Sequence, residues 1–145
     1  MSSIIDLLTN YYFLAFIIAW ILSIIIKTAL VALKKKKDPD IKDGFKNGGM
    51  PSSHSTIVSA ITFSIFLTNG LSPTFFVSLV FSMIIISDAF RLRRNVGLQA
   101  EQLNILLKKS KQKTVDVVHG HTFAQVIAGI LLGIIVSYLM FLIMF

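Results

Sequence analysis

Four long apolar stretches constrain the fold of this chain more than any other feature of its sequence. They cover residues 4–33, 55–69, 73–89 and 123–145. Each is near or above the roughly 20 residues that a helix needs to cross a bilayer. The second stretch is the shortest, and it reaches a spanning length only when residues 51–54 are added as a first turn. The sequence therefore predicts an all-α, polytopic membrane helix bundle with four transmembrane helices.

The balance of residue types excludes a soluble domain. The chain is 54% hydrophobic and only 14% charged, whereas a soluble surface on 145 residues would need far more charge. The opening residues MSSIID carry no Lys or Arg and lead into too long an apolar run for a signal peptide, so we expect the first stretch to be retained. No internal repeat or boundary divides the chain, which predicts a single integral membrane domain over residues 1–145.

The basic residues predict how the helices are oriented in the membrane. All 14 lie within the first apolar stretch or in two connections: Lys27; Lys34, Lys35, Lys36, Lys37, Lys42 and Lys46; Arg91, Arg93, Arg94, Lys108, Lys109, Lys111 and Lys113. The short connection at residues 70–72 and both termini carry none. By the positive-inside rule, both basic connections face the cytoplasm and both termini lie outside a cell membrane that the chain crosses several times.

The third connection, residues 90–120, has a pattern of its own. Leucine and valine recur there at roughly helical spacing among Arg, Asn, Gln and Glu, before the polar run KKSKQKT. We therefore expect the third span to continue into an amphipathic helix at the cytoplasmic surface. The lysines at residues 34–37 have a simpler interpretation, in which they only orient the protein and contact anionic headgroups. No basic module interleaved with aromatics is present, which argues against a nucleic-acid partner.

Polar residues suited to chemistry gather on the same cytoplasmic side. The first group is GGMPSSHS, residues 48–55, directly before the second span. Gly49 would let the backbone approach a ligand, and the N–H groups of Ser52, Ser53 and His54 would point out of a helix N-terminus, where anions such as phosphate bind. The alternative is a simple capped helix start.

The second group, DAFRLRRN, lies at the inner end of the third span. Asp88 and Arg91 are neighbours at i,i+3 on a helix, so an ion pair that merely anchors the helix end is one interpretation. One carboxylate cannot neutralise three arginines, however. We therefore expect at least one of the three to be free to bind a phosphate through its guanidinium fork.

The third group is His119-Gly120-His121-Thr122, at the start of the fourth span. Together with His54 these are the only 3 histidines of the chain, and all lie in the cytoplasmic half. Three histidines could hold zinc. The adjacent arginines would repel a cation and no supporting carboxylate is evident, so we expect an anion site with no metal or other cofactor. Lys27 lies about 9 Å, or six residues of helical rise, before the end of the first span, and it either snorkels or meets an anion.

These three motifs in order, GGMPSSHS, SDAFRLRRNVGLQAEQLN and GHTFAQVIAGILLG, resemble the divergent branch of the type 2 phosphatidic acid phosphatase (PAP2) superfamily, which includes vanadium haloperoxidases. The resemblance covers residues 20–133. It implies that Pro51-Ser52-Ser53-His54 replaces the family's P-S-G-H, with His54 as general acid. It also implies that His121 attacks phosphorus and becomes a phosphohistidine, and that Arg93 or Arg94 binds the phosphoryl oxygens.

The chain departs from the superfamily pattern at two points. Gln125 stands four residues after the residue that matches the nucleophile. The wider superfamily has an aspartate at this position, whereas the divergent branch, like this chain, has a glutamine. The K-x6-R-P motif is absent, and Lys27 is our substitute for its lysine. One ring nitrogen of His121 must be aimed at phosphorus, so the other needs an acceptor. The candidates, in order, are Asp88, Asp116 and the side-chain oxygen of Gln125.

The resulting hypothesis is a metal-independent hydrolase, a phosphatase of membrane lipid phosphates, with its active site at the cytoplasmic interface. Phosphatidylglycerophosphate ranks slightly ahead of phosphatidate and polyprenyl phosphates as the substrate. The alternative is a non-catalytic membrane protein that binds anionic lipid or a partner through the same cationic face. The outer halves of the spans offer too few polar groups for a transporter. A second copy of the chain, in a homo-oligomer, is the remaining partner considered.

Overall fold

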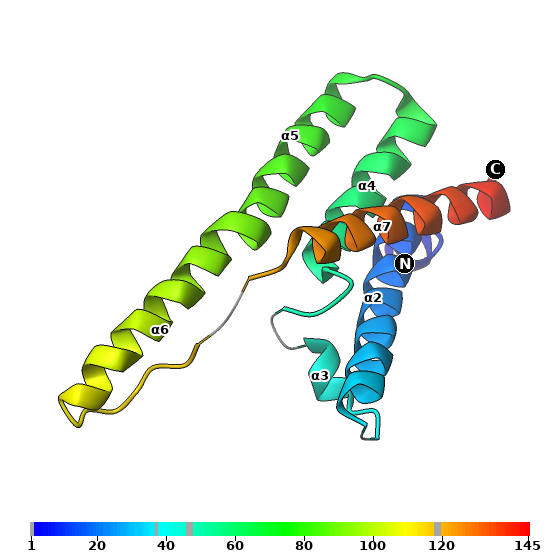
Figure 1. The fold of residues 1–145 in the computed structure, drawn as a ribbon. Helices are drawn as coiled ribbons and strands as arrows, with labels where there is room; N and C mark the ends of the chain where they lie inside the picture. The colour runs from blue at the N-terminus through cyan, green and yellow to red at the C-terminus, as the bar shows by residue number, and fades with distance from the viewer. Residues whose placement is uncertain (1, 37, 46–47, 118–119) are drawn as a thin grey trace.

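The computed structural model describes residues 2–36, 38–45, 48–117 and 120–145, and this part of the chain contains helices and no strand. The helices are α1 (Ser2–Leu8), α2 (Tyr11–Lys35), α3 (Ile41–Phe45), α4 (Ser53–Asn69), α5 (Pro73–Ser87), α6 (Arg93–Lys109) and α7 (Phe123–Met144), with a π-helical segment η1 (Asp88–Leu92) between α5 and α6. Figure 1 shows α4 beside α2 and α7, while α5 and α6 form one long rod. The all-helical class is confirmed.

Three helices are long and apolar enough to cross a membrane among the described residues: Tyr11–Lys35, Pro73–Lys109 and Phe123–Met144. The predicted count of four spans is therefore only partly met. The 17 residues of α4 give a length of about 25 Å, somewhat short of the roughly 30 Å hydrocarbon core. A crossing by α4 remains a prediction.

The first apolar stretch is not one helix, which corrects the expectation for residues 4–33. The chain breaks between α1 and α2 because Asn10 caps α2, its side-chain oxygen accepting a hydrogen bond from the N–H of Phe13 at 3.1 Å. An asparagine at this position satisfies a backbone donor that the first helical turn leaves free. The candidate span therefore begins at Tyr11 and reaches Lys35.

The third stretch continues without interruption through η1 into α6, giving 37 helical residues. The predicted continuation into a helix is thus observed. Exposed apolar side chains such as Val96 and Leu103 lie on α6 beside polar ones. Where α6 lies relative to a membrane surface stays a prediction.

Close contact between α4 and α7 forms the centre of the fold. The buried residues of α4 are small: Ser55, Thr56, Ser59, Ala60, Thr62 and Ser64. A Cβ atom added to Gly129 would lie 2.5 Å from the carbonyl oxygen of Ser52, and one added to Gly133 would overlap that of Thr56. The glycines at every fourth position thus allow the two backbones to touch, as expected for small-residue packing between membrane helices.

Hydroxyl groups join the same helices at the end away from η1. The Tyr11 hydroxyl donates to the Ser137 carbonyl at 3.0 Å, and the Ser64 and Ser137 hydroxyls are 2.7 Å apart. The Tyr12 hydroxyl lies 2.7 Å from that of Thr68. Thus hydrogen bonds join α2, α4 and α7 at this end, in addition to the close packing of α4 and α7 at Gly129 and Gly133.

We predict that Gly133→Val destabilises the protein by at least the roughly 1–3 kcal/mol typical of overpacking. The added side chain must displace the α4 backbone, because a Cβ at this position already meets Thr56 and, at 2.8 Å, the backbone nitrogen of Ala60. Thermal unfolding in detergent micelles measures the effect. Ala124→Val, at an exposed position of α7, is the matched control. Equal losses in both variants would contradict the close crossing.

Candidate functional site

A small cavity brings together the residues that sequence analysis selected from three distant segments. Its volume is about 140 Å³. The walls come from α2, from α3, from the first turn of α4 and from the segment just before α7. They consist of Trp20, Ile24, Lys27, Gly44, Phe45, Ser53, His54 and His121. Both predicted catalytic imidazoles and the predicted lysine therefore face one space.

His121 is held from three sides. It is buried, with 4% of its surface exposed. Its backbone N–H donates to the carbonyl of Ala89 in η1 at 3.1 Å. Its ring Nδ1 lies 3.2 Å from the carbonyl oxygen of Gly49 and 3.2 Å from Oε1 of Gln125. The ring is thereby oriented by α7, by η1 and by the segment before α4.

The hydrogen-bond network also determines which ring nitrogen carries the proton. The backbone N–H of Thr122 donates to Oε1 of Gln125 at 3.0 Å, so this side-chain atom is the oxygen and acts as an acceptor. A backbone carbonyl is likewise only an acceptor. Since both neighbours of Nδ1 accept, Nδ1 of His121 must donate. The other nitrogen, Nε2, then has a free lone pair in the neutral ring.

Of the three acceptors considered for His121, Gln125 makes the contact, and the Gly49 carbonyl adds a second acceptor that sequence reasoning missed. Asp88 instead accepts from Nε of Arg93 at 3.0 Å. Asp116 is exposed, and no contact joins it to His121. The ranking of Asp88 and Asp116 above Gln125 as the orienting acceptor was therefore wrong.

Lys27 lies deep in the site and does not snorkel to the surface. Only 4% of its surface is exposed, and it lines the cavity beside both histidines. Gly49 packs directly on its stem: a Cβ at this glycine, whose φ is +85°, would lie 3.0 Å from Cε of Lys27. A glycine is therefore required at residue 49 both by its backbone conformation and by the lysine beside it.

The start of α4 differs in part from the expected anion-binding N-terminus. Ser52 is fully buried and caps α4, and its backbone N–H donates to the carbonyl of Gln125 at 3.0 Å. That donor is therefore used to join α4 to α7 and does not point into the cavity. Ser53 does line the cavity, with its hydroxyl 3.0 Å from that of Ser23 on α2.

His54 lies between charges contributed by two other helices. It is partly buried, and Arg93, Asp88 and Lys27 all lie within electrostatic range of its ring. Asp88 and Arg93 therefore act on His54 without lining the cavity themselves. The side chains of Arg93 and Asp88 are only 38% and 35% exposed.

The ion pair at the C-terminal end of α5 is Asp88–Arg93, not the Asp88–Arg91 pair that regular helical spacing predicts. The π-helical turn explains the difference, because its wider turn aligns residues at i and i+5. Arg91 and Arg94 are exposed. Gly120 fits closely against this turn, since a Cβ there would lie 2.6 Å from the backbone nitrogen of Arg94.

Sequence reasoning missed the contribution of α3. Gly44 and Phe45 line the cavity, and the Phe45 ring packs edge-on against Trp20 with centroids 6.4 Å apart. Asp43 is almost completely buried, at 2% exposure. The adjacent pair Asp43-Gly44 within a basic connection was the signal that could have drawn attention to this segment.

His119 lies outside the described residues. Within the described ranges, no group of three His, Asp or Glu side chains is placed to hold a metal ion. The donor set around the cavity, two imidazoles and an ammonium, matches an anion in chemistry.

Burial lowers the pKa of His121 from its usual value near 6.5, and the neighbouring charges of Lys27 and His54 lower it further. The hydrogen bonds to Gln125 and Gly49 act in the opposite direction and raise the pKa. The net effect is a lowered pKa, so the ring is neutral near pH 7. A neutral ring with Nδ1–H and a free Nε2 is the form that a nucleophile requires.

The fold and the site define a helical membrane protein in which two histidines and a lysine share one small cavity. The chain belongs to the divergent PAP2 family, whose model matches residues 8–136. It is also similar to the uncharacterized membrane protein YuiD of Bacillus subtilis (strain 168), at 33% identity over 150 residues that cover 91% of this chain and 94% of the relative. No solved structure matches the chain.

We predict that nitrogen NMR of the folded protein shows His121 as the Nδ1–H tautomer at pH 7, with a titration midpoint below 6.5. The unfolded chain takes up this proton at about pH 6.5. Folding stability therefore falls as the pH drops from 6.5 through the lower folded pKa. Gln125→Leu removes a hydrogen bond that raises the pKa, so it should lower the midpoint further. The His121→Ala variant identifies the signals of His121, because these signals are absent from its spectrum. An Nε2–H tautomer or a midpoint above 6.5 would refute this geometry.

Proposed function

We propose that this protein is a metal-independent phosphatase that hydrolyses a lipid phosphomonoester through a phosphohistidine on His121. The single observation that carries the proposal is the hydrogen-bonded state of His121. Its Nδ1–H is shared by two acceptors, and the ring lines a cavity together with His54 and Lys27. A nucleophile, an acid–base partner and a cation thus meet in one space, as phosphoryl transfer requires.

In the first half-reaction, Nε2 of His121 attacks phosphorus and the P–O bond to the leaving group breaks. Protonated His54 gives its proton to the leaving alkoxide, which departs as an alcohol. In the second half-reaction, His54 takes a proton from water as the oxygen attacks phosphorus. The P–N bond then breaks, inorganic phosphate leaves, and both histidines return to their initial state.

The negative charge of the transferring group needs cations and N–H donors. Lys27 lines the cavity, and Arg93, with its guanidinium held by Asp88, lies within electrostatic range of His54. The N–H groups of the first α4 turn beyond Ser52, at Ser53 and His54, add the positive end of the helix dipole. Because these groups are fixed before substrate arrives, they stabilise the transition state without reorganising.

The size of the cavity limits what can enter it. Pockets for whole drug-sized ligands measure about 300–1,000 Å³, whereas this one measures about 140 Å³. Only the phosphate end of a lipid would enter, while the apolar remainder stays among the helices. Phosphatidylglycerophosphate remains slightly preferred over phosphatidate and polyprenyl phosphates, because lipids made on the cytoplasmic leaflet would meet an inward-facing site.

Four membrane crossings are supported by how the helix ends meet. The N-terminal ends of α4 and α7 are joined by the Ser52–Gln125 hydrogen bond, and the C-terminal end of α5 meets His121 through Ala89. Lys27, in the C-terminal half of α2, lines the same cavity. If α4 did not cross, the two basic connections would lie on opposite sides of the membrane, against the positive-inside rule. We therefore place the site and both basic connections in the cytoplasm and both termini outside.

Phosphate release tests the proposed activity. Purified protein should release inorganic phosphate from a panel of lipid phosphates equally well with and without chelator, and vanadate should inhibit it. His121→Ala should abolish turnover, and His54→Ala should reduce kcat by about 10²–10⁴-fold, the usual contribution of a general acid. Lys108→Ala, at an exposed site on α6, is the control for a lost surface charge. Lipid binding without release, unchanged in both histidine variants, would support the non-catalytic alternative instead.

Labelling of single cysteines from outside intact cells tests the topology. The chain has no cysteine of its own, so each substitution gives one reactive position. Leu71→Cys, in the turn after α4, should react with a membrane-impermeant maleimide. Asp40→Cys, before α3, should react only after the membrane is permeabilised. Labelling of both positions from the same side would exclude a crossing by α4.

A further inference from the structure

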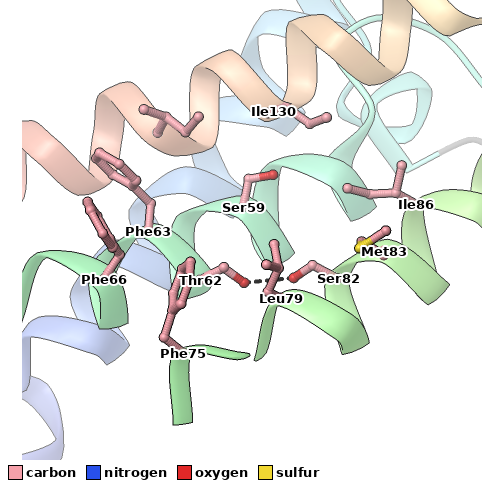
Figure 2. A pocket seen from close by; sticks show the side chains of 11 residues that line it. Ser59, Thr62, Phe63, Phe66, Phe75, Leu79, Ser82, Met83, Ile86 and Ile130 are labelled. Carbon is pink, nitrogen blue, oxygen red and sulfur yellow. Dashed lines mark hydrogen bonds between the residues drawn. The ribbon is translucent and has the colours of Figure 1, made fainter. Parts of the chain in front are cut away.

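An apolar groove of about 400 Å³ runs between α4, α5 and α7, separate from the catalytic cavity. Figure 2 shows its walls, with Ser59, Thr62, Phe63 and Phe66 on α4 and Leu79, Ser82, Met83 and Ile86 on α5. Although three of these side chains are hydroxyls, the accessible wall is almost entirely carbon. The groove is therefore suited to hydrocarbon.

Two of the three hydroxyls in the groove pair with each other. Thr62 and Ser82 are 2.7 Å apart, drawn as the dashed line in Figure 2. Ser82 also reaches the carbonyl of Val58 at 3.3 Å, and Thr62 that of Ser78 at 3.3 Å. These bonds tie α4 to α5 and occupy the hydroxyls of Thr62 and Ser82, while the accessible wall as a whole is almost entirely carbon. A charged or sugar-like occupant would lose its hydration there without compensation.

One end of the groove lies close to the catalytic site. Ile86 is two residues before Asp88, whose carboxylate holds Arg93 beside His54. Ser59 is five residues after His54, about 7.5 Å along the axis of α4. An occupant with an anionic head and an apolar chain, which is the charge pattern of an anionic lipid, could place its head near Arg93 and Lys27 and its chain in the groove.

The other end of the groove is bounded by aromatic rings. Phe66 of α4 and Phe75 of α5 are in contact, with ring centroids 5.4 Å apart, next to the turn between the two helices. From Ile86 to Phe75 the groove extends for 11 residues of α5, or about 16 Å. This length matches the roughly 15 Å that one leaflet contributes to the hydrocarbon core. An acyl chain fits this distance, whereas a polyprenyl chain is much longer.

We infer that this groove binds one acyl chain of the phosphate-bearing substrate and that the Phe66–Phe75 pair sets the length of chain that fits. The inference rests on the proposed function for its head group, and it selects glycerophospholipid phosphomonoesters over polyprenyl phosphates. The phosphate enters the small cavity at the start of α4, and the chain lies between α4 and α5 toward the outer end of the bundle.

Turnover by groove variants tests the chain site. Leu79→Trp fills the groove and should lower kcat/KM for a long-chain phosphate by at least about tenfold, the scale on which apolar pockets discriminate. Turnover of a short-chain, water-soluble phosphate should stay unchanged. Phe66→Ala opens the closed end and should shift the preference toward longer chains. Val80→Trp is the matched control, because Val80 lies on the exposed face of α5. Equal losses from Leu79→Trp and Val80→Trp, or faster turnover of polyprenyl than of acyl substrates, would overturn the inference.

Photolabelling separates this inference from the proposed activity, because it needs no turnover. An acyl phosphate lipid with a diazirine at its chain end should label the region around Phe66 and Phe75 in the wild-type protein and in His121→Ala alike. An excess of unlabelled phosphate lipid should compete, and Leu79→Trp should remove the label. Labelling with absent phosphate release would support the chain site and refute the phosphatase. Labelling spread equally over the outer face of α5, without competition, would refute the chain site.

Discussion

The direct contact between the backbones of α4 and α7 is the constraint on which the rest of the structure depends. Glycines at residues 129 and 133 remove the side chains that would separate the helices. Only at this distance can the N–H of Ser52 reach the carbonyl of Gln125. That bond fixes the start of α4 against the start of α7, and so places His54 and His121 in one cavity. Helix packing and the geometry of the cavity thus share one cause.

A second contact holds the loop before α7 against the π-helical turn. A π turn widens a helix by one residue and changes which side chains align. In this chain it pairs Asp88 with Arg93, and the carbonyl of Ala89 accepts the N–H of His121. The small residues at positions 89 and 120 permit this close approach. One irregular turn therefore positions a cation near His54 and anchors the backbone of His121.

Sequence patterns predicted the helical class and the gathering of GGMPSSHS, the arginine cluster and His121, because hydropathy and motif order report directly on segments and residue types. They failed where a single local interaction decided the outcome. Asn10 ends what looked like one long span, and the π turn replaces Arg91 by Arg93 as the partner of Asp88. Ser52 donates to α7 and not to a ligand. Such choices depend on which backbone groups meet in three dimensions, which periodicity does not encode.

The neutral side chain of Gln125 has a chemical consequence. A carboxylate beside Nδ1 of His121 would stabilise the positive charge that develops on the ring when Nε2 bonds to phosphorus, but it would also place an anion near an incoming phosphate. An amide oxygen fixes the tautomer without that repulsion. The lysine and the arginine near the cavity can then neutralise the phosphate itself. In the proposed reaction the cations, and not a buried carboxylate, would supply most of the transition-state stabilisation.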